Sequence, residues 1–185
     1  MRKYTTAISA LALVVSSAFA ASAFAVDGTI TINGKITDTT CTISVDGGSN
    51  DATVTLPTVS SSTLTAAGQT AGATPFNISL SSCSGTSLNT ASTYFEPGAY
   101  VDSTTGRLNI DSTAADAATN VQVELLNADR NAIVAGASVA NGQNDVPVDI
   151  SGGNGTLNYF AQYYATGAST AGSVTTQVDY TMTYE

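Results

Sequence analysis

The stretch of sequence that decides the fold reads Val26-Asp27-Gly28-Thr29-Ile30-Thr31-Ile32-Asn33. Its apolar side chains and its glycine occupy even-numbered positions, whereas its polar side chains occupy odd-numbered ones. A period of two is typical of a β-strand with one buried face. The stretch directly follows a predicted signal-cleavage site, where the free end of a mature chain is usually polar and frayed. We therefore interpret it as a strand that is made to pair with another segment.

Residues 1–25 have the pattern of an export signal. Arg2 and Lys3 supply the charged start, and residues 8–15 form an apolar run that is too short to span a bilayer. No later segment has the composition of a transmembrane helix. Small residues then lead to an A-x-A cleavage pattern, and we place the cut after the last of three candidate alanines, Ala20, Ala23 and Ala25.

Cleavage after Ala25 leaves 160 of the 185 residues, a length that suits one domain with a substantial core. The mature chain keeps three basic and all fourteen acidic side chains, for a net charge of −11. Such an acidic surface argues against nucleic acid and against anionic membranes as partners.

Two cysteines, Cys41 and Cys83, lie 42 positions apart. Because an exported chain matures in an oxidising compartment, we expect them to form a disulfide bond, and two free buried thiols are the alternative. Closing a loop of this size contributes about 4 kcal/mol in the chain-entropy model.

The remaining sequence is rich in Thr, Ser, Val and Gly, and its short alternating runs are separated by turn residues, as in a β-sandwich. A loop covers residues 60–72, with one helical turn around Leu64. We expect strands over residues 36–45, 54–56, 76–83, 94–95, 108–110, 121–125, 146–150, 157–165 and 178–184.

The first of these strands has its apolar side chains at odd positions, Cys41, Ile43 and Val45, unlike residues 26–33. A strand cannot change face without a bulge or a break, and Asn33-Gly34 is a suitable place for one. The two segments are therefore expected to face different cores.

The last strand places Val178, Tyr180, Met182 and Tyr184 on one face, and the sequence stops one residue later, at Glu185. An immunoglobulin-like sandwich normally continues from such a strand into one more that closes the core. The chain is thus expected to have a strand to spare at its start and to lack one at its end.

In this order and with this cysteine spacing, several segments resemble the chaperone–usher fimbrial subunits, or pilins, of Gram-negative bacteria. The resemblance covers the mature chain and is closest to type 1-like major pilins. It rests on Gly28-Thr29-Ile30, Gly34-Lys35-Ile36-Thr37-Asp38-Thr39-Thr40-Cys41, Phe76-Asn77-Ile78-Ser79-Leu80, Tyr163-Tyr164-Ala165-Thr166-Gly167 and Tyr180-Thr181-Met182-Thr183-Tyr184.

The resemblance implies an all-β fold: an incomplete immunoglobulin-like β-sandwich that lacks its final strand and is completed by donor-strand exchange. It divides the chain into a signal peptide over 1–25, an N-terminal donor-strand extension over 26–34 and a pilin domain over 35–185. It implies a structural shaft subunit of an adhesive fimbria that supports cell adhesion and biofilm formation.

By the same resemblance, Val26, Gly28, Ile30 and Ile32 point into the groove of a neighbouring subunit, with Gly28 where that groove is too shallow for a side chain. The acceptor groove and chaperone-docking surface is implied to include Val178, Tyr180, Met182, Tyr184 and Glu185. The implied partners are neighbouring pilin subunits, a periplasmic chaperone, an outer-membrane usher and a tip adhesin. The protein is expected to be exported through the periplasm to the cell surface and not to be membrane-embedded.

No catalytic, metal or cofactor site is expected. The sequence contains no histidine, which removes Ser-His and Cys-His nucleophile pairs and ordinary zinc sites. We interpret the acidic pairs in Gly-, Ser- and Asn-rich stretches as solvated turns, namely Asp111 with Asp116, Asn144-Asp145 and Asp46-Gly47. Four tyrosines could form a sugar-stacking platform, but their strand parity favours core or groove lining: Tyr159, Tyr163, Tyr180 and Tyr184.

A second hypothesis is a minor or tip fimbrial subunit that itself binds host glycans. Tip adhesins of the two-domain kind carry an additional lectin domain, whereas this mature chain is one domain with its own donor stretch. The sequence therefore favours a position within the polymer.

Overall fold

The computed structural model describes residues 30–85, 89–137 and 142–185. The chain forms two units, residues 1–35 and residues 36–185, and the described strands all belong to the second. The predicted signal peptide, together with Val26 and Gly28 of the predicted donor strand, lies outside the described residues. No helix in the described part of the chain has the length and apolar character needed to cross a membrane.

The described part of the second unit contains eight strands and one short 3₁₀ helix. In chain order these are β1 (Thr40–Val45), η1 (Ser61–Thr63), β2 (Thr70–Ser84), β3 (Thr90–Phe95), β4 (Leu108–Asn109), β5 (Val121–Leu126), β6 (Val148–Asp149), β7 (Gly155–Ala165) and β8 (Tyr180–Tyr184).

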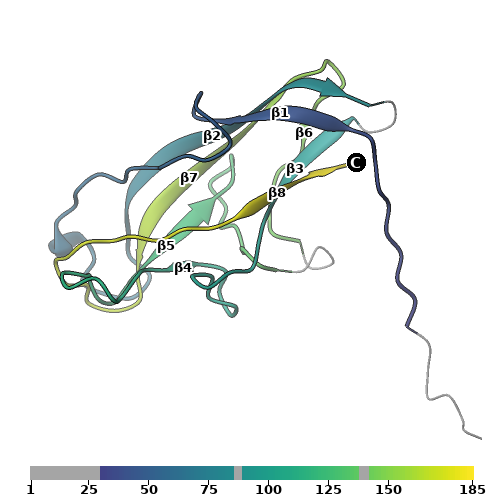
Figure 1. Ribbon diagram of the computed structural model, residues 1–185. Helices are drawn as coiled ribbons and strands as arrows, with labels where there is room; N and C mark the ends of the chain where they lie inside the picture. The colour runs from purple at the N-terminus through teal and green to yellow at the C-terminus, as the bar shows by residue number, and fades with distance from the viewer. Residues whose placement is uncertain (1–29, 86–88, 138–141) are drawn as a thin grey trace, which may run out of the picture. The chain divides into compact units, whose positions relative to one another are not determined.

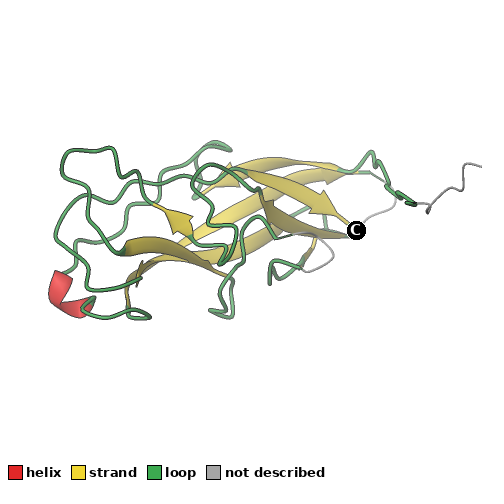
Figure 2. Ribbon diagram, turned by 90° about the horizontal axis from the view of Figure 1, so that it is seen from below, coloured by secondary structure: helices red, strands yellow, loops and turns green. Residues whose placement is uncertain are grey.

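The strands pair antiparallel in two sheets, one of five strands in the order β1-β2-β7-β5-β4 and one of three in the order β6-β3-β8. Figure 1 shows the long β2 and β7 side by side, and β8 alongside β3. Figure 2 shows that loops and turns make up much of the remaining chain, with η1 as the only helical element drawn. One buried cluster takes side chains from both sheets, so the sheets pack face to face as a sandwich.

Period-two alternation explains the central strands. In β7, Leu157, Tyr159 and Ala161 are buried, while their neighbours lie on the outer face. The Tyr159 ring contacts Phe76 of β2 and Phe95 of β3 at centroid distances of 5.3 and 5.4 Å, respectively. These three rings join the two sheets at the centre of the core.

The disulfide between Cys41 and Cys83 is present and joins β1 to β2, with the two Cα atoms 4.0 Å apart. The apolar face of β1 also agrees with the sequence, because Cys41, Ile43 and Val45 all pack against the main core.

Most strand bounds differ by a few residues from the sequence expectation: β2, for example, begins at Thr70, inside the expected loop over residues 60–72, and β3 begins at Thr90. Three further differences concern the first strand, residues 54–56 and the last strand. The first strand begins at Thr40 and not at Ile36, whose side chain is 99% exposed. Residues 54–56 form no strand, and the last strand begins at Tyr180, after Val178. The second and third differences have one cause, which lies in the groove described next.

Candidate functional site

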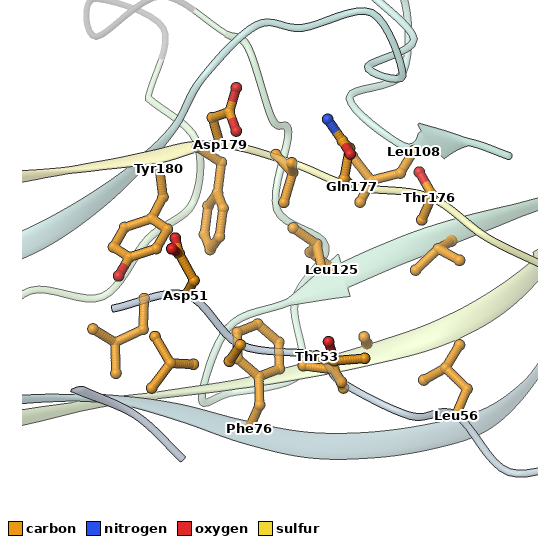
Figure 3. Close-up of a pocket in the computed structure, with 18 of the residues that line it drawn as sticks. Asp51, Thr53, Leu56, Phe76, Leu108, Leu125, Thr176, Gln177, Asp179 and Tyr180 are labelled. Carbon is orange, nitrogen blue, oxygen red and sulfur yellow. The ribbon is translucent and has the colours of Figure 1, made fainter. Parts of the chain in front are cut away.

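A groove with a cavity volume of about 840 Å³ opens between the edge of one sheet and the edge of the other. One wall, here called the first wall, is the segment 50–56 that follows β1. The second wall is the segment 174–179 together with the start of β8. Figure 3 shows the two walls facing each other, with Asp51, Thr53 and Leu56 on one and Thr176, Gln177 and Asp179 on the other.

The floor of the groove is the apolar core itself. Phe95 of the small sheet and Leu108, Val123 and Leu125 of the large sheet line the cavity, yet each is at most 5% exposed. Phe76, which Figure 3 shows beside the first wall, is 9% exposed. A strand inserted between the walls would therefore complete the hydrophobic core.

The first wall has no strand partner. Residues 52–56 make no hydrogen bond to any other residue that the structure describes. Val54 and Leu56 still pack against the core as half-buried side chains. Their alternation is that of a strand, and the predicted strand is absent because no neighbouring chain segment completes a ladder with it.

The second wall is hydrogen-bonded on one side only. The carbonyl oxygens of Thr175 and Asp179 accept from the main-chain N–H groups of Asp111 and Glu96, respectively, each at 2.8 Å. The odd-numbered residues thus hold the wall to the domain. The even-numbered residues Val174, Thr176 and Val178 line the cavity, and among described residues their main-chain groups have no partner.

The same alternation continues through β8. In the pairing with β3, Thr181 lies opposite Tyr94 and Thr183 opposite Ser92. Because antiparallel ladders bond through alternate residues, the main-chain groups of Tyr180, Met182 and Tyr184 point to the open edge. A free row of N–H and C=O groups beside an apolar floor is the arrangement that binds an extended peptide by β-strand addition.

On the side of β3 that faces away from β8, the part beyond the short pairing with β6 is closed by side chains. Asp145 accepts a hydrogen bond from the Thr93 main-chain N–H at 2.6 Å and one from the Tyr159 hydroxyl at 2.8 Å. The Gln143 amide accepts from the Phe95 N–H at 2.9 Å and donates to the Phe95 carbonyl oxygen at 2.8 Å. The interpretation of Asn144-Asp145 as a solvated turn is thus wrong for Asp145.

One side chain crosses the groove. The Tyr180 hydroxyl, which starts from β8, donates a hydrogen bond of 2.8 Å to the main-chain carbonyl oxygen of Asn50 at the start of the first wall. Burial, with a smaller contribution from the nearby Asp51 carboxylate, raises the pKa of the Tyr180 phenol above its ordinary value. The phenol therefore stays protonated, and able to donate, at neutral pH.

The other predicted site residues lie as follows. Val178 and Met182 line the cavity beside Tyr180, whereas Tyr184 packs against the core beyond the residues that line it. The Glu185 carbonyl oxygen accepts from the main chain of β3 at Thr90. Of the predicted donor residues, Ile30 and Ile32 are described, and both are almost fully exposed, at 91% and 89%.

The tyrosines that could have formed a sugar platform are divided between core and groove. Tyr159 is 1% exposed, while Tyr163 and Tyr180 line the cavity. In the part of the chain that the structure describes, no three Cys, Asp or Glu side chains come together in a way that could hold a metal ion.

Comparison with known proteins agrees with this geometry. The family model described as "FimA: Type-1 fimbrial protein, A" matches residues 56–185. The chain is 50% identical over 163 residues to the major fimbrial subunit SMF-1 of Stenotrophomonas maltophilia (strain K279a), covering 86% of this chain and 94% of that protein. It is 43% identical over 175 residues to the F17 fimbrial protein of Escherichia coli, covering 93% and 95% of the two chains.

The fold is also that of a solved pilin. The crystal structure of the P pilus rod subunit PapA superposes with a TM-score of 0.58 at 18% identity, over 78% of this chain and 99% of that one. At this identity the likeness concerns the fold, an immunoglobulin-like sandwich. The match to the family model and the sequence identity to known fimbrial subunits show the family as well as the fold. This chain belongs to the type-1 fimbrial protein family, whose members are structural subunits of bacterial fimbriae.

Proposed function

We propose that this protein is a shaft subunit of an adhesive fimbria and that it polymerises by donor-strand exchange, supporting cell adhesion and biofilm formation. The observation that carries the proposal is the open edge from Val174 to Tyr184, which lies over a buried apolar floor. A monomeric protein rarely leaves such an edge unprotected, because exposed edges aggregate. The groove is therefore a site for a strand from another chain.

The strand proposed to fill it is the N-terminal extension of a neighbouring copy, residues 26–34, after removal of the signal peptide. Ile30 and Ile32 are nearly fully exposed in the single chain, which favours a partner that buries them. Burying Val26, Ile30 and Ile32 contributes about 1.5–3 kcal/mol for each side chain, and ordering the free strand offsets part of that gain.

Before assembly, the open groove needs a temporary occupant. We assign this role to a strand of a periplasmic chaperone, with Tyr184 and Glu185 as part of its docking surface. Replacement by the neighbour's extension then takes place at an outer-membrane usher, and a tip adhesin ends the filament. No part of this cycle makes or breaks a covalent bond, so the protein needs neither a catalytic group nor a cofactor.

The decisive experiment changes one donor residue. Ile30→Asp places an unpaired carboxylate in the apolar groove of the neighbour, which costs far more free energy than the lost contact. We expect bacteria with this variant to keep normal amounts of monomer, measured by immunoblot, and to lose filaments, counted by electron microscopy. Normal filaments would refute donor-strand assembly, and a monomer that never folds would place Ile30 in its own core.

Thr31→Asp is the matched control, because it adds the same charge to the same strand on the opposite face. We expect it to leave filament number unchanged, which separates the effect of groove burial from the effect of charge. Immunogold labelling then distinguishes the two fimbrial roles, since a shaft subunit is labelled along the whole filament and a glycan-binding tip subunit only at its end.

A further inference from the structure

Met182 is the only methionine of the mature chain, because the other one, Met1, belongs to the predicted signal peptide. Methionine and free cysteine are the side chains that mild oxidants attack first. Both cysteines of this chain, Cys41 and Cys83, are already joined in the disulfide. Met182 is therefore the one side chain of the mature protein on which a mild oxidant is expected to act.

This methionine lies in the open groove. It lines the cavity from β8, two residues after Tyr180 on the same face, and Figure 3 shows the Tyr180 ring between the two walls. The floor of the groove is closed to solvent, with Phe95 only 2% exposed, whereas Met182 is half-buried. A cavity of about 840 Å³ that is open to solvent admits a molecule as small as hydrogen peroxide.

The sulfur is held in place by one hydrogen bond. Met182 lies directly opposite Thr93 in the pairing of β3 with β8, and the Thr93 hydroxyl donates to the Met182 sulfur at 3.7 Å. The Tyr159 hydroxyl lies 2.8 Å from the Thr93 hydroxyl and fixes it in turn. A thioether sulfur is a weak acceptor with two lone pairs, and the described residues form no second hydrogen bond to it. One lone pair thus remains for an oxidant.

We infer that Met182 is an oxidation site that can be reached only while the groove is empty, and that its oxidation by a peroxide prevents a strand from filling the groove. In this step a sulfur lone pair attacks one oxygen of hydrogen peroxide, and the O–O bond breaks as the S–O bond forms. The transferred oxygen gives its proton to the departing hydroxide, which leaves as water. The sulfur is oxidised to the sulfoxide, and the peroxide is reduced.

Oxidation converts an apolar side chain into a polar one within an apolar site. In the empty groove, water hydrates the sulfoxide oxygen. A strand that fills the whole cavity removes that water, and the valine, glycine and isoleucine residues proposed to enter have no side-chain donor to replace it. Burying an unpaired polar group in this way should weaken binding by about tenfold to a hundredfold. This part of the inference rests on the proposed donor-strand function.

The first measurement compares two states of the same protein. The purified mature chain and assembled filaments are treated with the same excess of hydrogen peroxide, and the gain of one oxygen atom per chain is followed by mass spectrometry. We expect filaments to be oxidised at least about tenfold more slowly than the free chain, because the inserted strand covers the sulfur. Met182→Leu should gain no oxygen in either state, which assigns the added mass to this residue.

The second measurement follows the effect of oxidation on the groove. A fluorescent synthetic peptide of residues 26–34 is titrated with the purified mature chain before and after peroxide treatment, and fluorescence polarisation gives the affinity. We expect the affinity to fall about tenfold or more after oxidation. It should return after treatment with methionine sulfoxide reductases for both sulfoxide epimers.

Two variants of Met182 provide the matched controls. Met182→Leu, whatever its own affinity, should bind the peptide equally well before and after peroxide treatment. Met182→Gln carries a polar end on a side chain of similar length without any oxidant. It should bind the peptide about tenfold more weakly than Met182→Leu, a comparison that holds even where oxidation itself unfolds the chain.

The outcomes separate this inference from the proposed function. Oxidation of filaments as fast as that of the free chain would overturn the inference, and so would an unchanged peptide affinity after oxidation or equal affinities of Met182→Gln and Met182→Leu. Donor-strand assembly would survive all three results. If the peptide fails to bind even the untreated chain, the donor-strand function is refuted and the inference fails with it.

Discussion

The outer sides of β3 and β8 in the small sheet have opposite surroundings. Beyond the short pairing of β3 with β6, the main-chain groups of Thr93 and Phe95 that face away from β8 are bonded to the side chains of Asp145 and Gln143. At the β8 edge, the corresponding groups of Tyr180 and Met182 have no partner among the described residues.

The difference shows that this fold closes most of the outer side of β3 with a loop in place of a full-length strand. Two side chains from one loop, together with the Gly136 main-chain N–H, satisfy the part of β3 beyond β6, and nothing comparable covers β8 in the described structure. The open edge also has the apolar floor, whereas the closed edge leads into a polar network with Tyr159. We therefore regard the opening beside β8 as a selected feature of the molecule.

The largest expected effect comes from releasing the wall opposite β8. Cys83→Ser removes the bond that holds β1 to β2, and it should lower the free energy of unfolding by about 4 kcal/mol. That loss is a large part of the stability of a single domain, so periplasmic yield should fall steeply. Immunoblots of periplasmic extracts measure this, and yield equal to the native protein would show that backbone pairing with β2 and core packing hold β1 without the disulfide.

The next largest loss of stability is expected when the cap on the outer side of β3 is removed. Asp145→Ala leaves the Thr93 N–H unpaired and removes one partner of the Tyr159 hydroxyl, which should cost about 3 kcal/mol because hydrogen bonds to a charged group are the stronger kind. Asp145→Asn retains one acceptor oxygen and should cost less. Urea denaturation of the purified mature chain measures both, and equal stability of all three proteins would mean that β3 needs no cap.

A smaller effect is expected at high pH. Burial, followed by the Asp145 charge, raises the pKa of Tyr159 above its ordinary value, so the folded chain holds this proton more tightly than the unfolded chain does. The resulting stability is present below pH about 10 and declines above it by up to about 1.4 kcal/mol per pH unit. Denaturation between pH 8 and pH 11 should show this decline, and Tyr159→Phe should flatten it.

The smallest loss of stability is expected when the hydrogen bond of Tyr180 is removed, and it can be compared with the loss at Tyr159. Tyr180→Phe removes the bond to Asn50 at the mouth of the groove and should lower stability by about 1 kcal/mol or less. Tyr159→Phe removes two bonds in the polar network and should cost more. Thermal unfolding of the two variants compares them directly, and a reversed order would show that the groove and not the capped edge is the rigid part.

Much of the fold follows from alternation in the sequence, because a strand with one buried face repeats every two residues. This is why β2, β7 and the inner face of β8 were predictable, whereas β5 alternates in sequence but is buried at every position. Residues 54–56 and Val178 have the same alternation but form no strand, since a ladder needs a partner and the structure describes none on the open side of these segments. Two of the failures of strand prediction thus lie in the groove walls, whereas the early starts of β2 at Thr70 and β3 at Thr90 lie outside them.

The closed edge could not be predicted for a different reason. Asp145 and Thr93 are 52 positions apart, and nothing near Asn144-Asp145 in the sequence distinguishes a cap from a solvated turn. The Tyr180–Asn50 bond joins residues 130 positions apart and uses a main-chain acceptor, which leaves no trace in residue type. The sequence predicted only that the Tyr180 side chain lies on the inward face of the last strand.

The position of the disulfide has a mechanical consequence. In a filament built by exchanged strands, tension enters each subunit through residues 26–34 and reaches the domain where β1 begins, at Thr40. Cys41 is the next residue, so the load passes at once through a covalent bond into the long β2. Under tension, β1 therefore cannot separate from β2 by the successive loss of its hydrogen bonds. The non-covalent contacts that carry the load are then those of the inserted strand.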